Sequence, residues 1–413
     1  MSSQLIDQAS PALATKRPID LGNVLFLTVT PIVALVGTAL YVHYNGIRAV
    51  DLAIFAVMYL LSGLSITAGY HRYFSHKTYE CSKPLQLFYL IFGAAAFENT
   101  VLHWSSDHRY HHQFVDQEED PYNILKGGFY AHMGWILLKN PRPRSVRFQN
   151  IPDLLKNPLA VWQDKYYLPI AITAGFILPM LVGLAFGRPL AGLLWGGFLR
   201  VVLVQHMTFL INSAAHLYGS RPYSLDNTAR DNAWLGVVTF GEGYHNFHHR
   251  FPADYRNGLR AHQFDATKWW LLAMRPLGLV SNLKRTPESL IVKARLDVEL
   301  RTLSEKFAPR EAAAPHAGAW TAMRERLETL KSSIEFSFAR YHQARRDYKA
   351  SRREASAASR RKLLAALETN RQEFRESLRK WSGAMSVLNR LPQPSAQLVT
   401  LTAFVDLLKQ SGL

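Results

Sequence analysis

The sequence predicts an all-α integral membrane protein with four transmembrane helices, a cytoplasmic cap rich in histidine and a helical extension at the C-terminus. Three observations predict this fold class. Four apolar runs are each long enough to cross a bilayer, which takes about 20 helical residues. Histidine motifs follow the second of these runs and recur after the fourth. Residues 284–413 are basic and hold 25 Lys and Arg against 14 Asp and Glu.

The apolar runs predict the membrane-spanning helices. They cover residues 21–42, 50–69, 167–186 and 190–212. The first run is too long for the core of a signal peptide, so we interpret it as an anchor. A fifth run, residues 85–103, contains Glu98 and Asn99 and is expected to lie at the membrane interface rather than to cross.

The distribution of Lys and Arg predicts the orientation. Cationic residues precede the first run and gather between the second and third, whereas the loops at 43–49 and 187–189 carry one each. The positive-inside rule therefore places the N-terminus, the 70–165 region and everything after residue 213 in the cytoplasm. The compact chain, in which we find no organellar leader, favours the inner membrane of a bacterium, with both termini cytoplasmic.

Histidine spacing is the strongest functional signal. The motifs are an H-x4-H at His71 and His76, and two H-x2-H-H motifs at His108, His111 and His112 and at His245, His248 and His249. With 16 histidines in 413 residues, only about 0.02 H-x2-H-H motifs are expected by chance. Residues three or four apart share a helix face, whereas the adjacent histidine diverges and can reach a second ion. Together with His216, one turn beyond Asn212, the motifs predict two bound metal ions.

The residue types narrow the kind of site. The chain has a single cysteine, which excludes an intramolecular disulfide framework and cysteine-rich metal sites. Imidazole ligands suit Zn, Cu, Fe and Ni. The acids Asp107 and Glu242 are candidates to accept the other ring N–H of ligating histidines. Two metal ions held beside a membrane favour an apolar substrate that approaches from the bilayer.

These motifs resemble those of the membrane fatty acyl desaturases, in particular a bacterial form of the stearoyl-CoA (acyl-CoA Δ9) desaturases. The resemblance covers residues 20–287, and the C-terminal extension has no counterpart in it. The matching stretches are Thr67–His76, Asp107–His112, Asp120–Asn123 followed by Gly128–Trp135, Asn212–His216 and Gly241–His249.

The resemblance implies a mushroom-like fold, two irons and O2 as co-substrate, with no catalytic residues beyond the metal ligands. One iron would be held by His71, His76, His108, His112 and His249. The other would be held by His111, His216, His245 and His248, with Asn212 reaching it through a water.

The resemblance also implies a kinked tunnel for an acyl chain. Trp104 and Thr208 would shape the bend near the metals, and Tyr59 and Gly63 would limit the chain length at the far end. Asn99 and Asp107 are further candidates to contact the substrate. Ser106 stands where the animal enzymes carry an arginine that helps to hold acyl-CoA, so other basic residues are expected to handle the head group.

The implied reaction is the O2-dependent insertion of a cis double bond, at Δ9, into a saturated acyl-CoA chain. We find no dinucleotide-binding, P-loop or cytochrome-b5-like segment, so a ferredoxin, a cytochrome-b5-like protein or a flavin reductase would supply the electrons. Nucleic acid is not an expected partner. Two alternatives are a membrane di-iron hydroxylase of alkane or sterol type and a non-catalytic membrane metal-binding protein. The Gly241–His249 stretch favours the desaturase, and histidines outside the spans argue against transport.

The sequence predicts four parts: a cytoplasmic segment over 1–20, the membrane domain over 21–287, a linker over 288–319 and a basic helical extension over 320–413. In the extension, apolar residues recur at steps of three and four in two runs that are out of register across 351–362. We expect a helical hairpin or one long helix with a phase break, whose apolar stripes are buried against each other or against a second copy. Residues 398–408 are expected to add a short helix.

Overall fold

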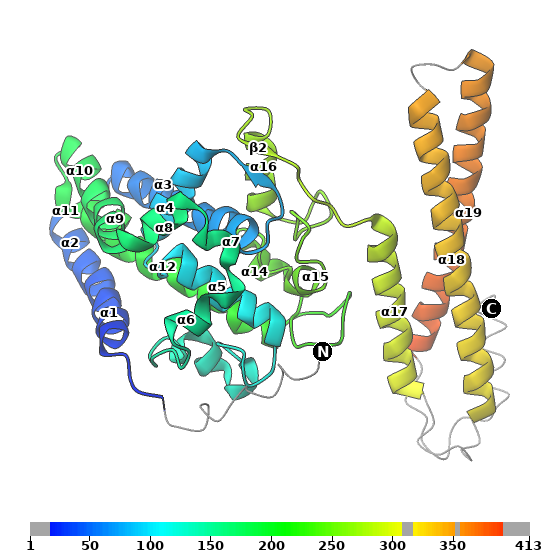
Figure 1. Cartoon of the computed structure of the whole chain (residues 1–413), viewed down its shortest axis with the longest axis horizontal. Helices are drawn as coiled ribbons and strands as arrows, with labels where there is room; N and C mark the ends of the chain where they lie inside the picture. Colours follow the sequence, from blue (N-terminus) through cyan, green and yellow to red (C-terminus); the bar gives the residue numbers. More distant parts are fainter. Residues whose placement is uncertain (1–16, 308–316, 352–355, 391–413) are drawn as a thin grey trace, which may run out of the picture. The chain divides into compact units, whose positions relative to one another are not determined.

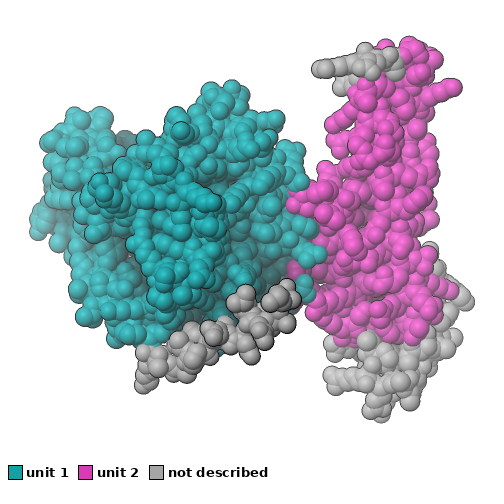
Figure 2. Space-filling model, in the orientation of Figure 1, with its two compact units in different colours: residues 1–221, 226–285 teal, residues 222–225, 286–413 magenta. Residues whose placement is uncertain are grey.

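The computed structural model describes residues 17–307, 317–351 and 356–390. The chain divides into two compact units, coloured separately in Figure 2. Unit 1 comprises Met1–Arg221 and Asp226–Arg285, and unit 2 comprises Pro222–Leu225 and Thr286–Leu413. Each unit is described by itself.

Four helices of the described residues are long and apolar enough to cross a membrane, as predicted. They are Leu21–Asn45, Ala49–Ser75, Tyr167–Ala185 and Pro189–Leu217. Each contains a π-helical stretch, so their segments in order are α1 (Leu21–Ile32), η1 (Val33–Gly37) and α2 (Thr38–Asn45); α3 (Ala49–Leu64) and η2 (Ser65–Ser75); α9 (Tyr167–Ile172), η6 (Thr173–Ile177) and α10 (Leu178–Ala185); α11 (Pro189–Ala191), η7 (Gly192–Leu199), α12 (Arg200–Asn212) and α13 (Ala214–Leu217).

The spanning helices turn large apolar side chains outward, as helices in contact with lipid do. Leu25, Leu35 and Leu181 are each more than half exposed. Arg200 is a cation inside the fourth span and is completely buried. Its guanidinium donates to the carbonyls of Gly196 at 3.0 Å, Ala95 at 2.5 Å and Gly175 at 2.8 Å. These bonds satisfy a charge that would otherwise be costly at this depth.

The fifth apolar run does not form a span. It forms α4 (Lys83–Ala94), which packs against η2 and α8, and a turn that leads into α5 (Val101–Phe114). Thr100 caps α5 by accepting a hydrogen bond from the His103 N–H at 3.3 Å. Because the chain does not cross here, the histidine motifs on either side of the run stay at the same end of the spanning helices.

Short elements complete unit 1. They are β1 (Glu80–Cys81), η3 (Ile124–Lys126), η4 (Tyr130–Gly134), α6 (Arg144–Arg147), η5 (Phe148–Asn150), α7 (Pro152–Leu155), α8 (Pro158–Lys165), α14 (Ala233–Val238), α15 (His245–Arg250), α16 (Ala266–Met274) and β2 (Val280–Ser281). The strands pair antiparallel, with Glu80 opposite Ser281. Figure 1 shows α5 and α15, which carry the two H-x2-H-H motifs, close together in this unit.

The described residues of unit 2 form three helices, α17 (Glu288–Phe307), α18 (Ala317–Ser351) and α19 (Ala357–Arg390). The colours in Figure 1 show α18 and α19 running antiparallel, so of the two alternatives the structure has the hairpin. Their apolar stripes bury against each other and α17 through Leu300, Met323, Leu327, Trp381 and Leu388.

The linker expected over 288–319 is wrong in its first part. Residues 288–307 form α17, and Leu296, Leu300 and Leu303 on this helix are buried in the core of unit 2. Its sequence is charged on the outer face, which obscured the apolar stripe. The expectations for residues 1–16, 308–316 and 398–408 lie outside the described residues.

Candidate metal centre and adjoining cavity

The nine histidines predicted as ligands gather into two groups. One contains His71, His76, His108, His112 and His248, and the other contains His111, His216, His245 and His249. Within each group one ring nitrogen of every histidine lies within 4.8 Å of those of the others. All nine come from four segments far apart in the sequence, so the fold alone creates the groups.

Local helix geometry sorts the ligands. In each H-x2-H-H motif the two histidines four residues apart enter the same group, and the one between them enters the other group. His71 and His76 are five residues apart, a spacing that diverges on an α-helix. The chain here is π-helical, with the His76 N–H donating to the His71 carbonyl at 3.2 Å. This winding places both rings on one face, with centroids 4.9 Å apart.

The structure interchanges two ligands relative to the assignment implied by the resemblance. His248 belongs to the five-histidine group, where its Nε2 lies 3.0 Å from His71 Nε2 and 2.9 Å from His112 Nε2. His249 belongs to the four-histidine group, with its Nε2 3.0 Å from His245 Nε2. The reason is the i, i+4 pairing of His245 with His249, which the sequence motif did not distinguish from i, i+3 pairing.

Polar partners orient several rings through Nδ1. His71 Nδ1 lies 2.9 Å from Glu242 Oε2, and His111 Nδ1 lies 2.9 Å from Asp120 Oδ1. His216 Nδ1 lies 2.8 Å from Thr228 Oγ1, which itself donates to Asp116 at 2.6 Å. His108 Nδ1 lies 3.1 Å from the Tyr122 hydroxyl. A carboxylate or an already donating hydroxyl can only accept, so in His71, His111 and His216 Nδ1 carries the hydrogen and the Nε2 lone pair points inward.

The groups have the chemistry of metal sites. Burial, and after it the neighbouring imidazoles, hold the pKa well below its usual value for several rings outside the spans: His76, His108, His112, His245, His248 and His249. Neutral rings with converging lone pairs repel one another unless a cation lies between them, and neutral imidazole is the ligand form. Each group therefore fits one bound metal ion.

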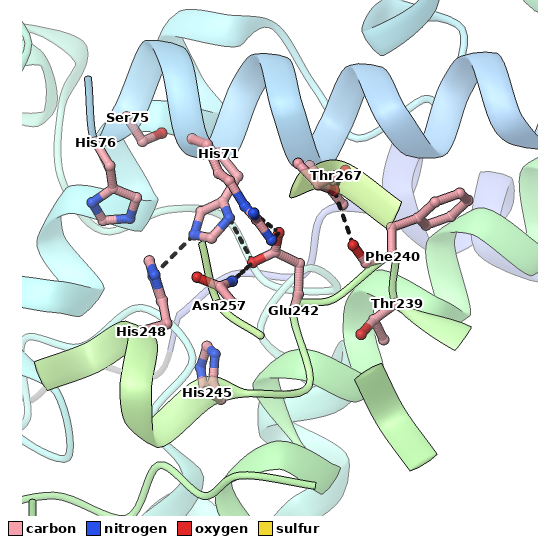
Figure 3. Close-up of polar contacts among 12 residues, drawn as sticks. His71, Ser75, His76, Thr239, Phe240, Glu242, His245, His248, Asn257 and Thr267 are labelled. Carbon is pink, nitrogen blue, oxygen red and sulfur yellow. Dashed lines mark hydrogen bonds and ion pairs between the residues drawn. The ribbon is translucent and has the colours of Figure 1, made fainter. Parts of the chain in front are cut away.

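A buried ion-pair network supports the five-histidine group (Figure 3). Glu242 accepts from Arg72 at 2.9 Å and from Asn257 Nδ2 at 2.6 Å in addition to its contact with His71. Arg72 is 1% exposed and also lies 3.0 Å from Asp265. Burial would raise the pKa of Glu242, but Arg72 and His71 outweigh it and lower the pKa. Glu242 therefore stays ionised and holds the His71 ring.

Replacing Glu242 with Gln is expected to weaken metal binding by about 10- to 100-fold, because an amide accepts more weakly from His71 Nδ1 than a carboxylate does. The measurement is a metal titration of the purified protein in competition with a chelator. Glu118→Gln is the control, since the Glu118 side chain is 72% exposed and forms an ion pair with Lys126, outside both histidine groups. Equal affinities of the two variants would contradict this role.

Asp107 has a different environment from the one expected. Its carboxylate is bound by Arg147, with Nε at 2.9 Å, and by Asn140 Nδ2 at 3.2 Å, and not by a ligating ring. The expectation that it accepts a ring N–H is therefore wrong. The Asp107 side chain thus contacts the 140–147 segment, whereas the next residue on α5, His108, belongs to the five-histidine group.

A cavity of about 440 Å³ adjoins both histidine groups through His71, His108 and His245. Its lining includes five of the other predicted site residues: Asn99, Trp104, Asp107, Thr208 and Asn212. Part of the wall is polar and basic, with Arg17, Asn140 and Arg147, and part is apolar, with Ile66, Phe97 and Phe209. Trp104 stacks on His108 with centroids 4.9 Å apart, so its ring forms part of the cavity wall beside the five-histidine group.

Tyr59 and Gly63 do not line the cavity. Both lie on α3, Gly63 one turn and Tyr59 two turns before Thr67, and Thr67 does line the cavity. Both residues face Phe240. The Tyr59 ring packs 5.2 Å from that of Phe240, and a Cβ at Gly63 would collide with the same ring. Phe240 therefore fills the space beyond Thr67 on this face of the helix.

Sequence reasoning missed several residues that the structure brings to the site. Asp120 and Tyr122 were noted only as part of a matching stretch, and Thr228, Arg147 and Glu98 were given no role. A signal existed for Glu98, an acid inside an apolar run. None existed for Thr228, which reaches His216 only through the loop that follows the fourth span.

Comparison with known proteins gives the chain its family. Residues 49–281 match the family described as fatty acid desaturase. A probable acyl-CoA desaturase of Schizosaccharomyces pombe is 45% identical over 253 residues, 60% of this chain and 52% of that protein. Acyl-CoA desaturase 1 of Saccharomyces cerevisiae is 41% identical over 251 residues, 60% of this chain and 49% of that protein.

The stearoyl-CoA desaturase of Sus scrofa is 39% identical over 241 residues, which are 57% of this chain and 66% of that protein. The chain thus spans about half the length of the two yeast relatives that it matches. The family match covers more than half of the chain and contains all nine clustered histidines. With its four apolar helices and its two histidine groups, this chain belongs to the fatty acid desaturase family.

Proposed function

We propose that this protein is an O2-dependent acyl-CoA desaturase that inserts a cis double bond at Δ9. The observation that carries the proposal is the cavity, which has both basic, polar side chains and apolar side chains in its wall and touches both histidine groups. An amphipathic acyl thioester has the same two-part character. The relatives named above are acyl-CoA or stearoyl-CoA desaturases, which supports the same substrate class.

The proposed metal is iron, one ion in each histidine group. Iron with O2 and two electrons supplies an oxidant able to remove hydrogen from an unactivated methylene. The histidines hold the ions, and Asn212, which lines the cavity beside the four-histidine group, is proposed to reach one through a water. Electrons would come from an external donor such as a ferredoxin, a cytochrome-b5-like protein or a flavin reductase.

The reaction balances with these components. A –CH2–CH2– unit loses two hydrogen atoms, which amount to two protons and two electrons. O2 takes up four electrons and four protons, of which the donor supplies the other two electrons and solvent the other two protons. The products are a –CH=CH– unit and two waters. The protein's part is positional, because a displacement of about 1 Å of the reacting bond can cost about 100-fold in rate. Trp104 and Thr208, which both line the cavity, are proposed to set that position.

Basic residues of the cavity wall are proposed to bind the head group. Ser106 replaces the arginine found in the animal enzymes, and its hydroxyl donates to the Arg147 carbonyl. Arg147 lines the cavity, as do Arg17 and Asn140. We propose that these side chains contact the head group in place of the arginine that helps to hold acyl-CoA in the animal enzymes.

The test is expression in a desaturase-deficient host, followed by gas chromatography and mass spectrometry of total fatty acids. We expect a monounsaturated acid with a Δ9 bond, absent from a His108→Ala, His111→Ala double variant. A hydroxy acid or an alcohol would identify a hydroxylase. No product, in cells shown to contain folded, iron-loaded protein and a working reductant, would contradict the desaturase assignment.

Phe240 is expected to limit the chain length. Replacing it with Ala removes the ring that faces Gly63 and Tyr59, so the cavity should extend past Thr67 by about one aromatic side chain. The expected result is a shift of the products toward longer acyl chains, measured by competing acyl-CoA substrates of different length. Phe336→Ala in unit 2, a 66% exposed phenylalanine, is the control and should leave the profile unchanged. An unchanged profile for F240A would contradict the role of Phe240.

The membrane orientation also stays a proposal. With both histidine groups at one end of four spans, we propose that both termini and the metal centre face the cytoplasm, and that the membrane is a bacterial inner membrane. The relatives named above are from eukaryotes. Reporter fusions at the C-terminus and in the 43–49 loop test the orientation, and opposite sides are expected for the two positions.

A further inference from the structure

Glu98 is an acid in the cavity for which the proposed reaction has no use. It follows Phe97, whose φ of +57° turns the chain between α4 and α5, and it lines the cavity beside Phe97, Thr208 and Phe209. Among the described residues no ion pair joins Glu98 to a cation. An ionised carboxylate in a cavity suited to an alkyl chain would be costly, so its hydrogen bonds decide its protonation state.

The contacts around Glu98 place one hydroxyl hydrogen, that of Thr208, between two acceptors. Trp104 Nε1 donates to Oε2 at 3.2 Å, and Oε1 lies 2.8 Å from Thr208 Oγ1. Thr208 Oγ1 also lies 3.1 Å from the Val204 carbonyl, which can only accept. A hydroxyl has one hydrogen, so Thr208 can donate to the carbonyl or to Glu98 but not fully to both. If Oε1 carries a proton, Glu98 donates to Thr208, Thr208 donates to Val204, and all three contacts are satisfied.

We infer that Glu98 is a neutral, proton-carrying positioning residue, which locks Trp104 and Thr208 across the bend of the acyl cavity. The effect of Glu98 on turnover rests on the proposed function. The presence of the proton on Glu98 does not depend on that function. Trp104 stacks on His108, so the same carboxyl fixes both a wall of the cavity and the ring beside the metal group. Thr208 lies on α12, so the carboxyl connects this helix to α5, which carries Trp104.

The surroundings favour the neutral form. The titratable groups that face Glu98 are Tyr70 on η2 and Tyr167 on α9, and neither supplies a positive charge. Arg200 on α12 uses its guanidinium on three backbone carbonyls. The charged groups elsewhere in the cavity wall are Arg17, Asp20, the pair Asp107–Arg147 and Glu242, which pairs with Arg72 behind the wall, besides the histidines of the metal groups. Burial raises the pKa of Glu98 to about 8, and Thr208 and Trp104 oppose this rise only in part.

Loss of the proton has a defined effect. A carboxylate at Glu98 would face the alkyl chain and would pull the Thr208 hydrogen away from Val204, so the two walls of the bend would no longer be held in one arrangement. With a pKa near 8, the neutral fraction falls about tenfold between pH 7 and pH 9. Turnover at saturating acyl-CoA should fall with it, because the reacting bond is misplaced, whereas KM should change little.

The first experiment reads the proton directly and needs neither iron nor turnover. Infrared spectra of iron-free wild-type and Glu98→Gln protein are compared for the carbonyl stretch of a protonated carboxylic acid. We expect the difference spectrum, wild type minus E98Q, to show this band at pH 7 and to lose it at pH 9; the difference removes the band of other protonated acids such as Asp231, whose pKa burial raises to about 7. Identical bands in the two proteins at pH 7 would overturn the inference. This arm keeps its meaning even if the protein makes no unsaturated product.

The second experiment reads the consequence. In Glu98→Gln the amide donates permanently to Thr208 and accepts from Trp104, so E98Q should keep its activity at pH 7 and should lack the tenfold loss at pH 9. Both proteins use the same donor, which cancels any pH effect on electron supply. Glu98→Asp, too short to reach both partners, should lose turnover at every pH while folding normally. Superimposable pH profiles for wild type and E98Q would overturn the positioning role.

Discussion

Replacing His111 and His249 together with Ala is expected to halve the bound metal, from two ions per chain to one, and to lower desaturation by at least about 100-fold. Both residues belong to the four-histidine group, which would retain only His216 and His245. Two imidazoles do not hold an ion against the chelators of a cell, whereas the five-histidine group keeps all its ligands. The size of the loss follows from the 10- to 100-fold cost of removing even an outer-shell partner of a metal ligand.

The measurement is metal content per chain by mass spectrometry, beside fatty acid analysis. His262→Ala is the control, because His262 is exposed and belongs to neither group. Retention of two ions would show that His111 and His249 are not ligands. Loss of both ions would show that the two groups do not bind metal independently.

Replacing Arg72 with Ala is expected to destabilise unit 1 by roughly 3–5 kcal/mol, because removal of one partner leaves a buried charge uncompensated. Arg72 is 1% exposed and lies between two carboxylates that are equally buried, Glu242 and Asp265. It also donates to the Tyr255 carbonyl at 2.7 Å. The loss should be visible in iron-free protein as a lower midpoint of unfolding in denaturant.

Two further variants serve as a control and as a partial rescue. Lys380→Ala breaks a pair whose side chains are 57% and 60% exposed, and it should change stability by less than about 0.5 kcal/mol. Arg72→Lys keeps the charge but not the forked geometry, and it should recover only part of the loss. An unfolding midpoint of R72A equal to that of wild type would contradict the importance of this network.

Much of the architecture could be predicted because its causes are local. A bilayer selects for about 20 apolar residues in a row, and the four predicted spans agree with the helices of the structure to within a few residues at most ends. The helical hairpin of unit 2 follows from apolar residues at steps of three and four. Helix α17 was missed because its apolar stripe is narrow and its other faces carry many charges.

Within the site, spacing predicted which histidines come together but not which group each one joins. His71 and His76 share a group because η2 is π-helical, and their spacing in the sequence does not predict a π-helix. His248 and His249 were interchanged because i, i+3 and i, i+4 neighbours look equivalent in a sequence. Asp107 was expected to accept from a ring, but α5 directs it toward Arg147.

The sequence by itself determined the class of the protein, the four spans and the nine histidines, because periodicity and residue type act over a few neighbouring residues. The tertiary structure decided the sorting of ligands, the acids that hold them and the walls of the cavity. Glu98 shows the physical reason most clearly. The proton that we infer for it follows from its contact with Thr208 and from the contact of Thr208 with Val204. Both residues are more than 100 residues away from Glu98 in the chain, and only folding brings Thr208 within hydrogen-bonding distance of the carboxyl.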